Sequence, residues 1–413
     1  MTRDVAAPHF ASRAPFPLLA TLAIQVLAAM AVLAPPVFAP VATVDIGVAT
    51  SAIGLFVALS YGASMASSLL AGDLVKKFGA IRVSQSCLLL CALGLALATV
   101  ATIPSLIAAA LLLGCGYGAV TPASSHILAR STSPQKMSLV FSLKQTGVPL
   151  GGALAGALVP SLILWNGWRA AALVVGLGCL LTALVVQPVR RVFDGEREPA
   201  RRVAMTGLAG PLRLAAANPA TRRLALGSLC FAAVQLCLTT YLVTYLTHDL
   251  GYTLVHAGLM LSISQGAGVV ARIAWGALAD RAARPLLVLG GLGCGMALFA
   301  SALAILAPQT PSLVVMLVCA AFGATAIGWN GIFLAEVARR APPGRTGDAT
   351  GGALFFTYLG ILIGPSIFAL LVAGGMDYPA AYVAITIPAL ACGLWLALQP
   401  RPRARADDGS ASS

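Results

Sequence analysis

The chain has 413 residues, of which 59% are hydrophobic and only 9% are charged. A soluble domain carries roughly 25% charged residues, so this composition excludes a soluble fold and indicates a protein that crosses a membrane several times. The net charge of +13 does not indicate a nucleic-acid partner, because the charged residues separate the apolar runs instead of gathering in one patch.

Twelve apolar runs are long enough to span a bilayer, which takes roughly 20 residues in a helix. In chain order they cover residues 17–40, 48–70, 83–102, 105–128, 137–162, 169–188, 223–246, 255–277, 286–307, 312–335, 349–373 and 380–399. The first run is longer than the core of a signal peptide, so we interpret it as a retained helix. The sequence therefore predicts an all-α membrane protein with twelve transmembrane helices.

The longest connection, residues 189–222, is rich in arginine and divides the runs into two groups of six. We expect an N-terminal half (1–188), a cytoplasmic linker (189–222) with a short surface helix near residues 207–217, a C-terminal half (223–399) and a cytoplasmic tail (400–413). An even number of spans places both termini on one side. If that side is the cytoplasm, all 26 Lys and Arg except Arg169 lie in the tails, in the inner loops or in the inner half of a helix, as the positive-inside rule requires.

The two groups are related as an internal repeat. Gly54 and Gly72 recur as Gly258 and Gly276 after 204 residues, and Gly147 and Gly151 recur as Gly360 and Gly364 after 213. Parallel repeats of this kind imply two pseudo-symmetric six-helix bundles, with a binding site between them near the middle of the membrane.

A glycine-rich charged motif lies between the second and third runs, from Gly72 to Arg82, and again between the eighth and ninth, from Gly276 to Arg284. With the twelve runs and the repeat, these segments resemble the major facilitator superfamily of secondary transporters, whose loop signature is roughly G-x-x-x-D-R/K-x-G-R/K-R/K. The resemblance implies that the two loops take part in the conformational switch, the residues concerned being Gly72, Asp73, Lys77, Gly79, Arg82, Gly276, Asp280, Arg281 and Arg284.

The first loop departs from the family pattern, because Lys76 stands where the family has an aspartate. In the family that aspartate latches the loop against helix 11 in the outward-open state. The departure puts this latch in doubt in the first half, and Asp73 is a candidate substitute.

A second resemblance to the family is the glycine- and proline-rich segment of the fifth run, which is echoed in the eleventh. We expect its glycines to pack helices closely and to let the two halves slide; they are Gly147, Gly151, Gly152, Gly360 and Gly364. The family's arginine motif early in helix 4 is missing here, so proton coupling of that type is not implied, and the coupling ion stays open.

Lys144 is the first candidate for a substrate ligand. If its helix begins at Pro134, Lys144 lies about 15 Å along it, near the middle of a hydrocarbon core about 30 Å thick. No carboxylate lies deep in any predicted run, so a substrate anion is the expected partner of the lysine. The alternative is a lysine that reaches the inner surface or is paired structurally.

Amides and aromatic side chains within the runs are further candidates, although each could equally join or pack two helices. They are Gln25, Gln145, Gln235, Gln265, Tyr61, Tyr241, Tyr358, Trp329 and Asn330. Arg272 precedes Gly276 by four residues, so we expect it at the cytoplasmic end of helix 8, in contact with the loop motif; substrate contact is the alternative.

The sequence contains no phosphate-binding glycine loop, nucleophile elbow or cluster with metal-ligand spacing, so we expect neither an enzyme, a cofactor nor a metal. We expect a monomer in the inner membrane that binds a small molecule. The interpretation is a transporter of a small organic anion that works by rocker-switch alternating access. Export of hydrophobic or drug-like compounds by the same fold is the main alternative, and a membrane sensor or assembly scaffold that has lost transport is a third.

Overall fold

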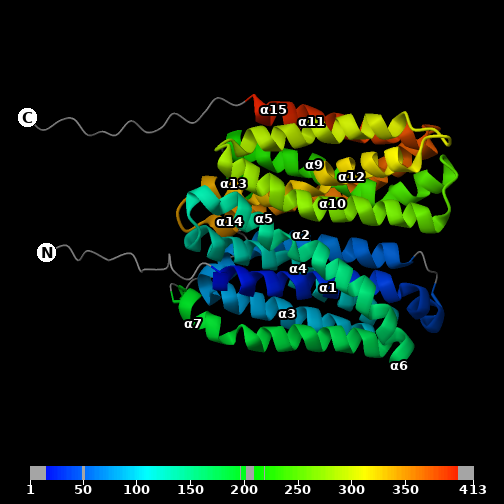
Figure 1. Cartoon of the computed structure of the whole chain (residues 1–413). Coiled ribbons are helices and arrows are strands. Elements are labelled where there is room, and N and C mark those ends of the chain that lie inside the picture. Colours follow the sequence, from blue (N-terminus) through cyan, green and yellow to red (C-terminus); the bar gives the residue numbers. More distant parts are fainter. Residues whose placement is uncertain (1–14, 49–51, 196, 201–208, 218, 399–413) are drawn as a thin grey trace, which may run out of the picture.

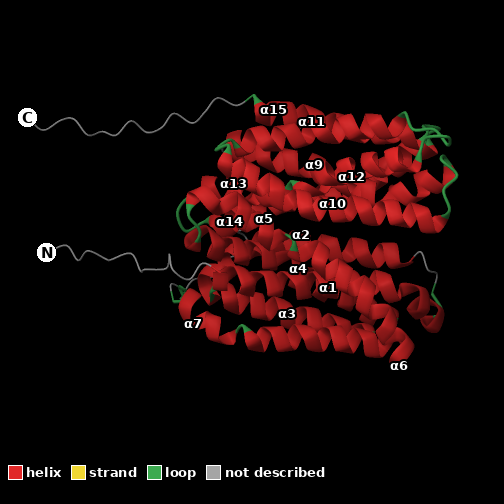
Figure 2. Ribbon diagram, viewed as in Figure 1, coloured by secondary structure: helices red, strands yellow, loops and turns green. Residues whose placement is uncertain are grey.

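The computed structural model describes residues 15–48, 52–195, 197–200, 209–217 and 219–398. Within this part of the chain there are helices and short connections but no strand (Figure 2). Figure 1 shows the long helices as two stacked groups, one formed by the first half of the chain and one by the second.

The first group contains the helices that precede the linker. They are α1 (Pro15–Ile46), α2 (Ala52–Phe78), α3 (Ala80–Ala98), α4 (Ile103–Ser131), η1 (Pro134–Lys136), α5 (Met137–Gln145) and α6 (Gly147–Val185). Three short helices follow, η2 (Gln187–Val189), α7 (Arg190–Phe193) and α8 (Ala209–Ala217).

The second group begins after α8. Its helices are α9 (Pro219–His248), α10 (Leu254–Arg281), α11 (Pro285–Ala304), α12 (Ser312–Gly328), α13 (Asn330–Arg340), α14 (Thr346–Ala373) and α15 (Tyr378–Ala397). There are two apolar cores, one in the first group and one in the second, and the second also includes Leu128, Met137 and Phe141 of α4 and α5. Large exposed hydrophobic side chains such as Leu164 and Leu298 lie on the outside, where lipid would lie.

Eleven helical segments of the described chain are long and apolar enough to cross a membrane. One of them, covering residues 134–193, contains two crossings, because helical geometry is interrupted at Asn166 and Gly167. Gly167 has a φ of 77°, a conformation that glycine adopts without steric cost. The prediction of twelve transmembrane helices in an all-α protein is therefore confirmed.

Helix α1 begins and α15 ends at the same end of the bundle, where α7 also lies (Figure 1). We call this the linker end, and the opposite one the far end. The short helix expected near residues 207–217 is present as α8. It is partly buried, because its Pro211 packs against Gly352 of α14.

Two crossings, one in each half, are interrupted at a single residue that keeps helical φ and ψ angles. The fifth breaks at Thr146, between α5 and α6, and the tenth breaks at Trp329, between α12 and α13. The first break has a local cause: Pro149 has no N–H, so the carbonyl of Gln145 four residues earlier has no partner within its own helix.

The glycines of the fifth and eleventh crossings hold each half together. A Cβ atom at Gly151 would press on the main chain of Val26 in α1, and one at Gly360 would overlap the carbonyl of Leu229 in α9. The five glycines singled out in the sequence thus lie against helices of their own half and not between the halves. Gly72 and Gly276 do lie between the halves, against Asp348 of α14 and Ser142 of α5.

Candidate functional site

Lys144 lies in the last turn of α5 and is 1% exposed. Its Nζ donates hydrogen bonds to Oε1 of Gln25 (2.6 Å), Oε1 of Gln145 (3.0 Å) and Oγ1 of Thr121 (3.2 Å). An ammonium group has three donors, so all three are used. Lys144 does not reach the surface, and its partners in the described chain are neutral oxygens.

Three helices of the first half supply these partners: α1 provides Gln25, α4 provides Thr121, and α5 provides Lys144 and Gln145. The Thr121 hydroxyl also donates to Oε1 of Gln25 (3.1 Å). The Nε2 of Gln25 is buried without a hydrogen-bond partner. A buried donor left unpaired costs about 1–3 kcal/mol, so an acceptor placed beside this N–H group would be favourable.

Thr121 is missing from the residues that the sequence singles out. The signal available for it was a hydroxyl residue directly before Pro122, inside an apolar run. Such a position is common in membrane helices, and it does not reveal that the side chain meets Lys144, which lies 23 residues away.

Arg272 is 2% exposed and lies nine residues before the end of α10, well inside the bundle. Its Nη1 donates to the carbonyl of Gln145 (2.5 Å), and its Nη2 donates to the carbonyl of Ile327 (2.8 Å). The expectation of a place at the helix end beside the loop motif is therefore not met. Arg272 supplies the hydrogen bond that the Gln145 carbonyl lacks because of Pro149.

Gln145 connects two buried cations. Its side chain accepts from Lys144 of the same half, and its carbonyl accepts from Arg272 of the other half. One residue thus joins Lys144 to a contact between the two halves.

A second polar group lies in the C-terminal half, at the break between α12 and α13. Oε1 of Gln235 in α9 accepts from Nε1 of Trp329 and from Nδ2 of Asn330, both at 3.1 Å. The structure thus brings together three residues that the sequence predicts as separate candidates.

The remaining candidates are dispersed. Tyr61 and Tyr117 pack against Tyr358 of the other half, with ring centroids 6.2 and 6.5 Å apart. Tyr241 instead donates to the carbonyl of Pro365 within its own half. Gln265 is exposed on α10, at the position that matches Tyr61 in the repeat.

The second loop motif is fixed by its aspartate. Asp280 accepts from the backbone N–H groups of Ser138 (3.1 Å) and Leu139 (2.8 Å), in the first turn of α5. An anion is favourable at a helix N-terminus. Arg339 adds a salt bridge to Asp280 (2.8 Å) and a hydrogen bond to the carbonyl of Pro134. This loop of the C-terminal half is thus attached to the N-terminal half.

The first loop motif makes the matching contact with its charges exchanged. Nζ of Lys76 lies 2.6 Å from Oδ2 of Asp348, which also pairs with Arg345 (2.9 Å). Asp348 lies in the first turn of α14, the eleventh crossing, directly against Gly72. Lys76 therefore takes the place of the family's aspartate by pairing with a carboxylate on the opposite helix.

The linker docks on the same loop. Asp194 accepts from the backbone N–H groups of Ile81 (2.9 Å) and Arg82 (3.0 Å) at the start of α3. Gly79 has a φ of 94° and lies so close to Asp194 that a side chain would not fit. Burial raises the pKa of the Asp194 carboxyl, and these two hydrogen bonds oppose the rise.

The other loop residues lie at the surface of the linker end. Lys77 lies over the ring of Phe78 at 5.3 Å, and Arg281 and Arg284 are exposed at the end of α10.

In the described residues, the polar contacts between the halves lie at the linker end or at the level of Gln145. They include Lys76–Asp348, Asp280–Leu139 and Arg272–Gln145, together with a hydrogen bond from Ser68 to the carbonyl of Gly351. The linker end is therefore closed by both loop motifs.

These loops, the twelve crossings and the repeat agree with the sequence model of the Major Facilitator Superfamily, which matches residues 21–365. The chain belongs to this superfamily. An uncharacterized MFS-type transporter of Mycobacterium tuberculosis is 25% identical over 272 residues, which are 65% of this chain and 59% of that protein. The probable nitrate/nitrite transporter NarK2 of the same species is 31% identical over 207 residues, 49% of each chain. The matched part thus spans only half to three fifths of these relatives' own length.

Solved structures show the superfamily fold over nearly the whole chain. The E. coli fucose:proton symporter FucP has a TM-score of 0.74 and 18% identity, covering 95% of this chain and 100% of its own. The human organic anion transporter MFSD10 has a TM-score of 0.71 and 18% identity, covering 93% and 99%. These likenesses establish two pseudo-symmetric six-helix bundles, and the superfamily places the chain among transporters rather than enzymes.

Proposed function

We propose that this chain is a secondary transporter of a small organic anion, a carboxylate being the favoured class. It acts in the inner membrane, with both termini cytoplasmic. The observation that carries the proposal is Lys144: a cation buried in the middle of the bundle, bonded to three neutral oxygens, with no carboxylate among its described partners. A charge buried without an opposite charge is costly, and an anionic substrate would remove that cost.

The names of two similar proteins support an anion. NarK2 is named as a probable nitrate/nitrite transporter, and MFSD10 as an organic anion transporter. Arg272 adds a second buried cation next to Gln145. The free N–H group of Gln25 adds a neutral donor beside Lys144.

The contacts suggest how binding starts the switch. The substrate enters from the far end, and its carboxylate replaces one neutral oxygen on Lys144. If that oxygen belongs to Gln145, the hydrogen bond from Arg272 to the same residue is disturbed. The two loop contacts at the linker end then separate, and the site opens to the cytoplasm, as alternating access requires.

The test is Lys144→Met, which keeps the length of the side chain and removes the charge. The matched control is Lys136→Met, an exposed lysine two helical turns earlier. Hydrogen bonds to charged groups contribute about 1.5–3 kcal/mol, so we expect Lys144→Met to weaken binding of the substrate about tenfold or more. Purified protein is screened against organic acids by thermal shift, and the acid that binds is then followed by uptake into proteoliposomes. Unchanged binding and uptake in Lys144→Met would refute the role of Lys144.

One observation favours the second candidate, efflux of hydrophobic or drug-like compounds. All three donors of Lys144 already have acceptors inside the protein, which suits a structural lysine beside a neutral ligand. In that case a strain that lacks the transporter becomes sensitive to such compounds, and both wild type and Lys144→Met restore its resistance.

A further inference from the structure

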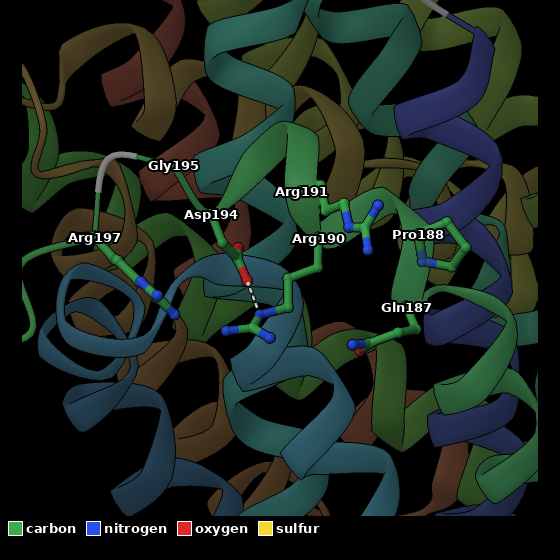
Figure 3. A pocket seen from close by; sticks show the side chains of 7 residues that line it. All are labelled: Gln187, Pro188, Arg190, Arg191, Asp194, Gly195 and Arg197. Carbon is green, nitrogen blue, oxygen red and sulfur yellow. Dashed lines mark ion pairs between the residues drawn. The ribbon is translucent and has the colours of Figure 1, made fainter.

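The linker end of the N-terminal half contains a cavity of about 770 Å³ that is separate from the site around Lys144. It is lined by Gln187, Pro188, Arg190, Arg191, Asp194, Gly195 and Arg197 (Figure 3). A neighbouring cavity of about 280 Å³ shares Arg190 and Arg197 and adds Lys77, Phe78, Arg82 and Pro199. Neither cavity has a role in the proposed transport of a substrate.

The two cavities carry an excess of positive charge. Their lining contains five cations, Lys77, Arg82, Arg190, Arg191 and Arg197, and one described carboxylate, Asp194. Glu196 precedes Arg197 in the sequence and lies outside the described residues.

The carboxylate is already engaged. Asp194 accepts from the N–H groups of Ile81 and Arg82 and lies 3.5 Å from Nε of Arg190. Figure 3 shows the side chain of Arg190 directed at Asp194. The guanidinium of Arg191 and the amide of Gln187 lie on the opposite side of Arg190, around the opening of the cavity. A cavity of this kind attracts an anion that offers several oxygens to guanidinium groups, and a phosphate has that chemistry.

The level of the cavity in the membrane decides between a lipid and a soluble phosphate. Leu184 and Val185, at the end of the apolar helix α6, are 69% and 75% exposed, and Gln187 of the cavity follows two residues later. Phe78 adds an exposed aromatic ring at the edge. An apolar surface that can contact acyl chains thus lies next to a cluster of arginines, at the level where the hydrocarbon core would end. This combination fits a phospholipid, which has acyl chains and a phosphate.

We propose that this cavity binds the headgroup of an anionic phospholipid in the leaflet on the linker side. Arg190 and Arg191 hold the phosphate, Arg197 adds positive charge from the other side of Asp194 (Figure 3), and the surface of Leu184 and Val185 receives an acyl chain. The bound lipid also holds the linker against the first loop motif, because the linker segment that lines the cavity is bonded to that motif at two points. Asp194 accepts from the N–H group of Ile81 in α3, and the backbone N–H group of Glu198 donates to the carbonyl of Lys76 (2.8 Å).

The experiment titrates the purified full chain, in phosphatidylcholine nanodiscs or detergent, with phosphatidylglycerol. Thermal unfolding and native mass spectrometry report binding. The test variant is Arg190→Gln/Arg191→Gln/Arg197→Gln, and the control is Lys136→Gln/Arg213→Gln/Arg222→Gln, which removes three exposed charges elsewhere at the linker end. We expect a saturable rise in Tm for wild type and control, and an affinity at least tenfold lower for the test variant.

Three results would overturn the proposal. Equal weakening in the control would show attraction by net charge without a defined site. The same rise in Tm with glycerol 3-phosphate or inorganic phosphate, at the same concentration, would assign the cavity to a soluble phosphate. Because the triple variant removes the Arg190–Asp194 contact, Arg191→Gln alone is measured as well. Arg191 is exposed, so this change spares the fold, and an affinity equal to that of wild type would also contradict the site.

Discussion

At the scale of single residues, a proline in one half leaves a backbone carbonyl without a donor, and an arginine of the other half supplies that donor. Pro149 cannot donate to the carbonyl of Gln145, and the guanidinium of Arg272 donates to it at 2.5 Å instead. The arginine is thereby held in the interior, 127 residues from its acceptor.

This pair can be tested by rescue. Arg272→Gln leaves the Gln145 carbonyl without its donor and should lower the free energy of unfolding by about 1–3 kcal/mol. Pro149→Ala restores an N–H group at the position where an α-helix bonds residue 145. The loss caused by Arg272→Gln should therefore be smaller in the Pro149→Ala background, by about 1 kcal/mol. Thermal or denaturant unfolding of the four proteins measures the coupling, and equal losses in both backgrounds would argue against it.

At the scale of elements, glycines divide into those within a half and those between halves. Gly360 lies against Leu229 of the same half, whereas Gly351, on the same helix, lies against the carbonyl of Ser68 in the other half. Both are sites where an added Cβ would overlap main chain, so the two make a matched pair.

We expect Gly360→Ala and Gly351→Ala to have different effects, the first on the stability of the fold and the second on the opening of the linker end. Overpacking costs about 1–3 kcal/mol, so Gly360→Ala should lower the stability of the fold in every conformation. Gly351→Ala should act only while the linker end is closed, and should therefore favour its opening with a smaller fall in Tm. Labelling of a cysteine placed at Ser68 reports the opening. Equal falls in Tm, with no gain in labelling, would contradict the distinction.

The exchanged charges of the first loop motif act between elements. Lys76 and Asp348 are 14% and 6% exposed, and breaking a buried pair by changing one partner costs about 3–5 kcal/mol. Lys76→Asp places two carboxylates together and should open the linker end and slow transport. The double variant Lys76→Asp/Asp348→Lys restores opposite charges and should recover most of the activity. Uptake into proteoliposomes measures both, and a double variant no better than Lys76→Asp would exclude a simple charge latch.

At the scale of the whole molecule, the linker end is closed in this structure. Alternating access requires the far end to close when the linker end opens. Leu55 and Leu259 are exposed, matching positions near the far ends of α2 and α10. Gln135 and Arg284 are exposed at the linker end, in different halves.

Spin labels on these two pairs can follow the motion. During turnover with substrate, the Leu55–Leu259 distance should shorten and the Gln135–Arg284 distance should lengthen in the same molecules. Pulsed electron resonance measures both distributions. Two distances that change in the same direction, or stay fixed, would contradict a rocking motion of two rigid halves.

The architecture can be predicted from the amino-acid sequence alone. Hydrophobic length, the return of glycines after 204 to 213 residues and the position of charged residues can be read from the sequence without knowledge of any contact, and they were sufficient to predict twelve crossings, two related halves and the superfamily. They also indicated Lys144 as a candidate site residue, because a lysine inside an apolar run can be recognised in the sequence before any of its contacts are known.

The contacts that these residues make could not be predicted and are known only from the folded structure. Thr121 and Arg272 belong to the network around Lys144 through contacts across 23 and 127 residues, which no spacing along one helix reports. In the sequence, Lys76 is only a departure from the family's loop pattern. The structure shows that it forms an ion pair with Asp348 on another helix. The physical reason is the same in each case: a buried polar group must find a partner, and in a helical bundle that partner usually comes from another helix.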